Sequence, residues 1–239
     1  QNAVVFAYGD VALPPTVGVP TPAPVSPWGS GNATAIVEEL VSMDEYTTYR
    51  LSVTLSEHAT NLYSIFGIED TPLSIPAAFQ VATPFGSNIG GISPVFATAD
   101  ATSMFDSWLT VGITEGDVNN ALSTIGLDFD AWTIFTRLES TDGAVFWLNP
   151  DNGPSGTVTV AQITIPVGSS AVATMALQGQ STSGVGTPWR DIVSFALGDG
   201  QSGPAPLPDN ACTLAVDVVV AEQWCEAQGG PAQSTAVIC

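Results

Sequence analysis

Apolar and polar residues alternate along several short stretches of this chain. In residues 51–55, for example, Leu51, Val53 and Leu55 are separated by Ser52 and Thr54. Alternation with a period of two is typical of a half-buried β-strand, whose successive side chains point to opposite faces. The stretches that we predict to be strands on this pattern are 51–55, 108–111, 158–163 (ending at Pro166) and 171–178.

The segments between these strands are rich in turn-forming residues, most clearly in 149–154 (NPDNGP). Residues 117–125 (DVNNALSTI) are predicted to form two turns of helix, with Asp117 or a nearby Ser or Thr as its cap. No long amphipathic helix alternates with the strands, which argues against a parallel α/β fold. The predicted fold class is therefore all-β, as an antiparallel β-sandwich of the jelly-roll or immunoglobulin-like type.

Two Pro-rich stretches divide the chain. The first contains six prolines between Pro14 and Pro27, and the second is GPAPLP at 203–208. Proline at this density lacks the amide donors of a central strand and favours an extended polyproline II path. The predicted organisation is an N-terminal arm (1–13), a linker (14–32), a sandwich body (33–200), a second linker (201–208) and a Cys-containing tail (209–239).

Both outlying segments contain apolar stretches that favour a strand. In the arm, this stretch is formed by Val4, Val5, Phe6 and Tyr8, and the tail has a second one at 213–220. The first linker spans roughly 40 Å as polyproline II. An apolar strand held at that distance must fold back onto its own body or add to the open edge of a neighbour. Repeated addition would assemble copies head to tail into a filament with terminal strands exchanged.

The charge balance excludes some partners. The chain has 23 acidic residues, only three basic ones (all Arg) and a net charge of −20, so it lacks the cations that neutralise nucleic-acid phosphates. The surface of an anionic membrane would repel it as well. No apolar run is long enough to span a membrane. A hydrophobic fraction of 45 % nevertheless predicts a folded protein.

The sequence gives little support for catalysis, and we predict a protein that is not an enzyme. His58 is the only histidine, so any Ser–His–Asp or Cys–His site would require it. We expect His58 to lie at the surface, and there is no G-x-S-x-G motif. A zinc site is disfavoured because Cys212, Cys225 and Cys239 are 13 and 14 positions apart (225 − 212 and 239 − 225).

Carboxylates crowd into the predicted loops, which would suit calcium as a cofactor. No loop matches the D-x-[DN]-x-[DN]-G pattern, so the main expectation is that these are solvated turn residues and that no cofactor is bound. The candidate calcium ligands are Asp128, Asp130, Asp142 and Asp151, with Glu115, Asp117 and Asn152 beside them.

Tryptophans carry the second functional hypothesis, which is a secreted carbohydrate-binding or adhesion module assisted by calcium. Trp108, Trp132, Trp147 and Trp189 lie in or beside apolar stretches and could line a sugar-binding face. We expect at least three of the four to be core residues instead.

Several features favour an extracellular protein. Asn32-Ala33-Thr34 is an N-glycosylation sequon, and the chain has three cysteines and no lysine. It begins at Gln1 without a leader, as a mature chain does after its signal peptide is removed, although a trimmed chain would begin in the same way. The expected location is extracellular or at the cell surface.

The first linker also resembles a known class of sequence. Residues 21–27 (TPAPVSP) resemble the glycomodules of plant and green-algal arabinogalactan and extensin-like wall proteins. Residues 105–112 and 143–148 resemble secreted β-rich surface proteins of aquatic microbes. The first resemblance implies hydroxylated prolines that carry O-glycans, at Pro20, Pro22, Pro24 and Pro27.

The three cysteines of the tail leave more than one disulfide pairing open. Cys212–Cys225 is the preferred pair, because the intervening residues permit a strand, a turn and a return. Cys212–Cys239 and Cys225–Cys239 are equally allowed by counting. One cysteine is left over, and it could bond a neighbouring subunit.

Overall fold

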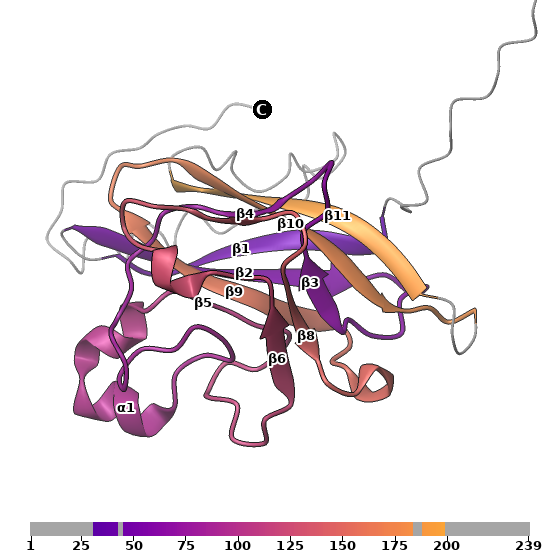
Figure 1. The fold of residues 1–239 in the computed structure, drawn as a ribbon, viewed down its shortest axis with the longest axis horizontal. Helices are drawn as coiled ribbons and strands as arrows, with labels where there is room; N and C mark the ends of the chain where they lie inside the picture. The colour runs from indigo at the N-terminus through magenta and orange to yellow at the C-terminus, as the bar shows by residue number, and fades with distance from the viewer. Residues whose placement is uncertain (1–30, 43–44, 184–187, 199–239) are drawn as a thin grey trace, which may run out of the picture.

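The computed structural model describes residues 31–42, 45–183 and 188–198, and these form an all-β sandwich of two antiparallel sheets (Figure 1). The predicted fold class is confirmed. The N-terminal arm, both Pro-rich segments and the Cys-containing tail lie outside the described residues.

The first sheet has the strand order β1–β2–β9–β5. Its strands are β1 (Ala33–Ser42), β2 (Tyr46–Leu55), β9 (Thr157–Pro166) and β5 (Trp108–Leu109). The predictions at 51–55 and 158–163 are confirmed within β2 and β9. The predicted strand 108–111 is shorter, because the Thr110 hydroxyl binds the backbone of Ile113 and Gly112 turns the chain at φ 84°.

The second sheet is centred on β10, which confirms the prediction at 171–178. On one side β10 pairs with both β3 and β4. Beyond β3 the sheet continues with β8 and then β6, and beyond β4 it continues with β7. On its other side β10 pairs with β11, so that Ala176 lies between Phe66 and Ile192. The strands are β3 (Ser64–Phe66), β4 (Leu73–Ile75), β6 (Leu122–Ile125), β7 (Leu138–Ser140), β8 (Ala144–Trp147), β10 (Ala171–Gln180) and β11 (Pro188–Leu197).

The predicted helix at 117–125 is wrong. The Asp117 carboxylate accepts hydrogen bonds from the backbone N–H groups of Ala121 and Leu122, at 2.8 and 2.7 Å, and so holds a loop instead of capping a helix. From Leu122 the chain continues as β6, because pairing with β8 buries Leu122 in the core. A local helical preference is overridden here by a non-local strand partner.

Helical structure in the described residues is short. It consists of α1 (Pro94–Ala99) and the 3₁₀ turns η1 (Ala101–Phe105), η2 (Phe129–Ala131) and η3 (Pro150–Asn152). η3 lies within the predicted turn at 149–154. None of these helices has the length and apolar character needed to cross a membrane.

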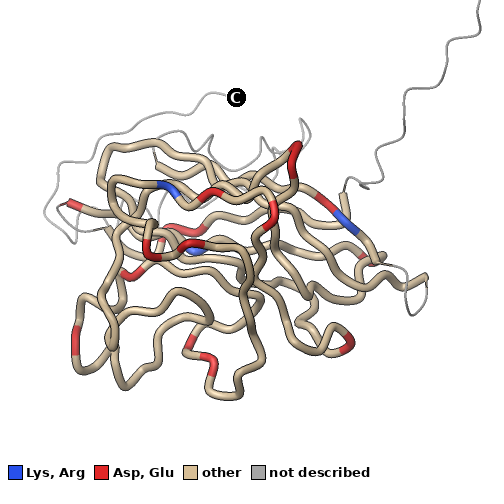
Figure 2. Tube along the Cα trace, in the orientation of Figure 1, with Lys and Arg blue, Asp and Glu red and all other residues tan. Residues whose placement is uncertain are grey.

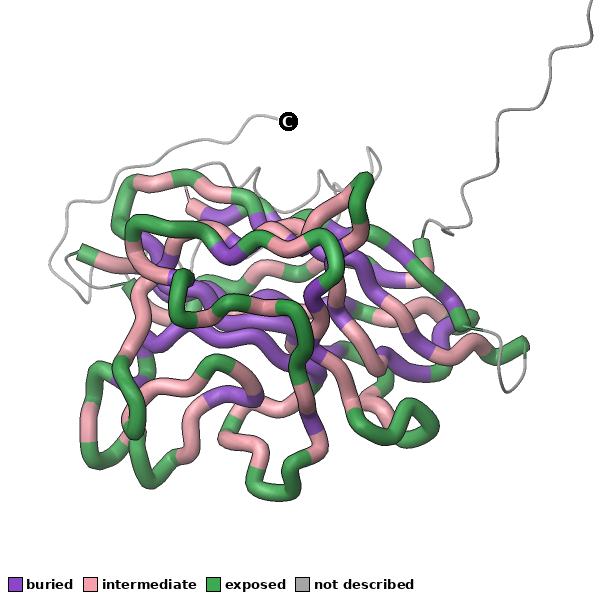
Figure 3. Tube along the Cα trace, viewed as in Figure 1, coloured by how far each residue is buried: buried purple, intermediate pink, exposed green. Residues whose placement is uncertain are grey.

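The core lies between the two sheets and combines the inward faces of the long strands. Leu51 and Val53 of β2 meet Ile65 of β3 and Leu177 of β10, all without exposed surface. Figure 3 shows these buried stretches along the strands, with exposed stretches in the connecting loops. Trp108, Trp132 and Trp189 are buried, as predicted for at least three of the four tryptophans.

Residues of the segment 76–107 cover part of the outer face of the first sheet, at β9 and the neighbouring residues of β2. The Gln162 amide on β9 donates to the carbonyl oxygens of Met104 and Asp106, at 3.0 and 2.8 Å, and Arg50 lies 5.1 Å from the ring centre of Trp108. Trp108 is therefore buried beneath this segment and not between the sheets. Burial raises the pKa of Asp106 to about 6, although backbone N–H groups bind its carboxylate.

Candidate functional site

The first sheet ends in a long strand that is paired on one side. Within the described residues β1 pairs with β2 alone, along a strand of 10 residues (Figure 1). An unpaired strand edge presents backbone N–H and C=O groups that can accept another strand. The outer side of β1 is therefore a candidate site for assembly.

The pairing shows which backbone groups face that side. The Leu55 N–H donates to the carbonyl of Gly156 next to β9, so Leu55 faces β9 and its neighbour Thr54 faces β1. Thr54 pairs with Thr34, and alternation then directs the backbone groups of Ala35 and Val37 away from β2. The Ala35 and Val37 side chains pack against the core, whereas Ile36 on the opposite face is 39 % exposed.

β11 fixes the beginning of β1. The buried Asp191 carboxylate accepts hydrogen bonds from the backbone N–H groups of Gly31, Asn32 and Ala33, at 3.1, 2.9 and 3.2 Å. One side chain thus joins the edges of the two sheets. Because its position is fixed by these bonds, the first half of β1 is preorganised to receive a strand.

The second half of β1 is protected against strand addition. Glu38 and Glu39 are exposed there, and the register with β2 shifts between Glu39 and Val41. Charged residues and bulges are devices that keep edge strands from pairing. The stretch suited to an added strand is therefore 33–37, which we call the acceptor edge.

Asn32 lies directly before the acceptor edge. Its backbone carbonyl accepts the N–H of Ser56 at 2.8 Å and its N–H binds Asp191, so this sequon lies at the beginning of an ordered strand. Thr34 is exposed on the same face as Ile36. Glycosylation of Asn32 stays a prediction.

His58 and the acidic residues are dispersed over the described part of the chain. The His58 side chain is 75 % exposed, as predicted, and its Nε2 lies 3.7 Å from the Glu57 carboxylate. No group of three or more His, Cys, Asp or Glu side chains in the described ranges could hold a metal ion. Figure 2 shows the acidic positions spread over both sheets and the loops.

The candidate calcium ligands have separate local roles. Asp128 accepts the N–H of Ala131, the Ser140 hydroxyl donates to Asp142, and the Gln180 amide donates to Asp151 at 2.6 Å. Asp130 is exposed at η2. Calcium binding stays a prediction, without a site that brings these four residues together.

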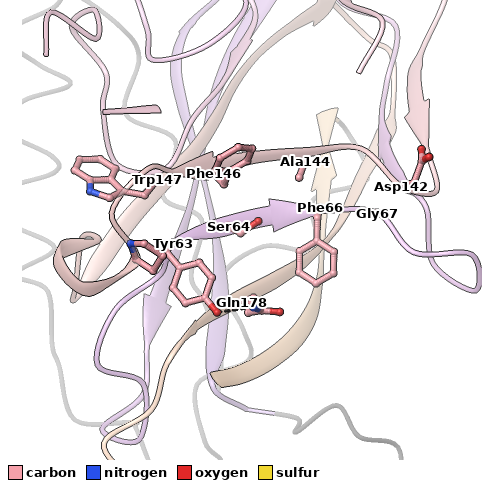
Figure 4. Close-up of a pocket in the computed structure, with 10 residues that line it drawn as sticks. Tyr63, Ser64, Phe66, Gly67, Asp142, Ala144, Phe146, Trp147 and Gln178 are labelled. Carbon is pink, nitrogen blue, oxygen red and sulfur yellow. Dashed lines mark hydrogen bonds between the residues drawn. The ribbon is translucent and has the colours of Figure 1, made fainter. Parts of the chain in front are cut away.

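An aromatic groove on the outer face of the second sheet was not predicted from the sequence. It is lined by Tyr63, Phe66, Phe146, Trp147 and Gln178, among others, and of these only Trp147 was a candidate (Figure 4). The signal was present in the short strands β3 and β8, where Phe66 and Phe146 occupy outward positions that would usually be polar. Strands of this length are too short for alternation to reveal them.

Other predicted site residues lie outside the described residues. They are Val4, Val5, Phe6 and Tyr8 of the arm, Pro20, Pro22, Pro24 and Pro27 of the linker, and Cys212, Cys225 and Cys239 of the tail. Their roles stay predictions.

Comparison with known proteins gives no relative: no family model, no curated protein and no solved structure matches the chain. The choice between the candidate sites therefore rests on geometry and chemistry.

Proposed function

We propose that this protein is a structural subunit of an extracellular glycoprotein filament, in which copies assemble head to tail by strand exchange. The observation that carries the proposal is the acceptor edge, a regular stretch of β1. The outward N–H of Ala33 is bound by the Asp191 carboxylate, whereas the outward backbone groups of Ala35 and Val37 pair with no strand among the described residues. Addition of an extended segment to such an edge is a common mode of recognition.

The arm supplies a matching donor. Residues 4–8 (VVFAY) and residues 33–37 (ATAIV) have the same length, and both are rich in residues that favour strands. Neither segment carries a charge, so pairing them places no like charges opposite one another. The donor is therefore suited to the first half of β1 and not to the half that carries Glu38 and Glu39.

The linker favours pairing between copies over pairing within one copy. Its prolines favour an extended path of roughly 40 Å, and an arm at the far end of such a path would have to reverse direction to reach the β1 that directly follows the linker in its own chain. Donor and acceptor are different surfaces, so each bound copy offers a new free edge. Such a heterologous contact continues as an open filament unless its rotation closes a ring.

Composition supports the extracellular setting. A sequon, three cysteines and a Pro-rich segment occur in a chain that has no lysine. A glycan at Asn32 would leave from the face shared with Thr34 and Ile36, perpendicular to the backbone groups of the acceptor edge. Glycosylation and strand addition are thus compatible on the same strand.

The experiment that tests this function removes the donor. Deleting residues 1–13 should leave a folded body that no longer forms filaments in negative-stain microscopy and elutes as a monomer in size-exclusion chromatography. The milder change Phe6→Asp should act almost as strongly, because it places a charge in an apolar contact, while Phe6→Leu should still assemble. Filaments of normal appearance from the truncated chain would contradict the proposal.

A further inference from the structure

The outer face of the second sheet carries a groove of about 360 Å³. This lies within the range of small-molecule sites in proteins, about 300–1,000 Å³. Its floor is formed where β8, β3 and β10 run side by side, with Ser64 paired to Phe146 on one side and to Gln178 on the other. This face belongs to the second sheet, whereas the acceptor edge belongs to the first.

Aromatic rings form the walls of the groove. Tyr63, Phe66, Phe146 and Trp147 are all half-buried, so each ring keeps part of its surface accessible. The Trp147 indole is held in place because its Nε1–H donates to the Asn152 side chain at 2.7 Å. Figure 4 shows the rings of Tyr63 and Phe66 on either side of Gln178.

A chain of hydrogen bonds fixes the polar groups of the groove. The Arg190 Nε–H donates to the side-chain oxygen Oε1 of Gln178 at 2.7 Å, and the side-chain nitrogen Nε2 of Gln178 donates to the Tyr63 hydroxyl. A phenol that accepts a hydrogen bond still has its own proton to donate. Tyr63 can therefore present a donor, held in orientation by Gln178, next to the aromatic rings.

From this arrangement we infer that the groove binds an uncharged carbohydrate, which is a function beyond filament assembly. The C–H faces of a pyranose ring pack against aromatic rings, and its hydroxyl groups bond to amide, phenol and hydroxyl groups such as those of Gln178, Tyr63 and Ser64. The groove thus offers both kinds of contact that a sugar requires.

Charge selects a neutral ligand. Asp142 lies in the lining of the groove and Arg190 binds the lining residue Gln178, so one charge of each sign is close to the site, whereas the chain as a whole carries a net charge of −20. A polyanionic glycan would be repelled on approach to such a surface. A neutral polysaccharide from the surroundings of the protein is therefore the occupant to which the groove is best suited.

Affinity electrophoresis of the full chain tests this inference. One set of gels contains a neutral polysaccharide, either laminarin or galactomannan, and a parallel set contains the anionic polysaccharide alginate. At least one neutral polymer should retard the protein, and alginate should not. Phe146→Ala should weaken the affinity for this polymer, measured from the retardation, by about tenfold, because a stacking ring is lost. Tyr63→Phe keeps the ring and its packing, and should weaken binding by a few-fold through loss of the hydroxyl.

Val172→Ala is the matched control, because Val172 lies on β10 with 57 % of its surface exposed and outside the groove lining. It should bind as the unchanged protein does, and thermal melts should show that all variants are folded. The inference is overturned if the folded protein binds neither neutral polymer, if it prefers alginate, or if Tyr63→Phe and Phe146→Ala bind normally. If the protein binds no polysaccharide and the two groove variants no longer form filaments, the groove is instead a contact between copies.

Discussion

The two edges of the first sheet are built in opposite ways. The β5 edge is two residues long, and residues 88–90 lie along it: Leu109 donates to the carbonyl of Asn88 at 3.0 Å, and Gly90 donates to the carbonyl of Leu109 at 2.9 Å. The β1 edge extends over 10 residues, and within the described residues its outer side pairs with no strand, although the Asp191 side chain of β11 binds the N–H of its first residue, Ala33. Short, covered edges protect a monomer against pairing. Within the described residues the fold therefore covers the short edge and leaves most of the longer one without a partner strand.

The β1 edge itself repeats this contrast on a smaller scale. Its second half has two glutamates and a register shift, whereas its first half is regular, uncharged and fixed by Asp191. The protection therefore limits where a strand can add, without closing the whole edge. This difference locates the acceptor in 33–37.

Two proline substitutions break this comparison most directly. Ala35 and Glu39 both precede the register shift and, by alternation, both direct their backbone groups away from β2. Ala35→Pro removes an outward donor from the acceptor edge and should raise the protein concentration needed for filaments by about tenfold or more. Glu39→Pro, in the protected half, should leave assembly nearly unchanged.

Light scattering against protein concentration measures both variants, and circular dichroism checks that both remain folded. Equal effects of the two prolines would show that the distinction between the halves of β1 is wrong.

At the covered edge of the first sheet, Asp106 holds the segment that leads to the residues along β5. The Asp106 carboxylate accepts the N–H groups of Val81 and Ser87, both at 2.7 Å, and Ser87 leads directly into the residues that cover β5. Burial raises the folded-state pKa of this group from 3.8 to about 6. Between these values the folded protein binds the proton more tightly than the unfolded chain does, so this contribution to stability falls as pH rises through 6.

For this pKa difference, the contribution of Asp106 to the free energy of unfolding falls by about 3 kcal/mol. Asp106→Asn has no proton to lose, so the difference in unfolding free energy between the original protein and this variant should change with pH by that amount. Urea titrations from pH 3.5 to pH 7 measure it. A pH-independent difference for Asp106→Asn would contradict the assignment.

The smallest effect is expected from the glycan. Thr34→Ala removes the sequon and should abolish glycan mass at Asn32 in peptide mass spectrometry. Filaments should still form, because the side chain of Asn32 is directed away from the open backbone groups. Loss of assembly with the loss of the glycan would mean that the sugar itself forms part of the contact.

The sequence was sufficient for the fold class and for parts of the long strands β2, β9 and β10, because each of them contains an alternating stretch. β1 escaped prediction because its register shift interrupts the alternation, although β11 has a regular pattern that could have been used. The error at 117–125 came from Asp117, whose capping chemistry serves a loop as well as a helix.

The candidate sites were less accessible to prediction than the fold. The groove combines residues from three strands that lie far apart in the chain, and two of these strands are only three or four residues long. β1 has a free outer side because it is the last strand in the order of the described sheet, and this order depends on pairing between segments far apart in the chain. The donor could be proposed from its composition, whereas its acceptor required the sheet.

The most direct test of strand exchange places a photo-crosslinker on the donor. Benzoylphenylalanine at Phe6 should, after illumination of filaments assembled from mixed light and ¹⁵N-labelled copies, join the arm to a peptide that contains residues 33–37. Crosslinks of mixed isotope composition would show that the two segments belong to different copies. Crosslinks confined to single copies, or joined to other parts of the body, would contradict assembly by strand exchange at the acceptor edge.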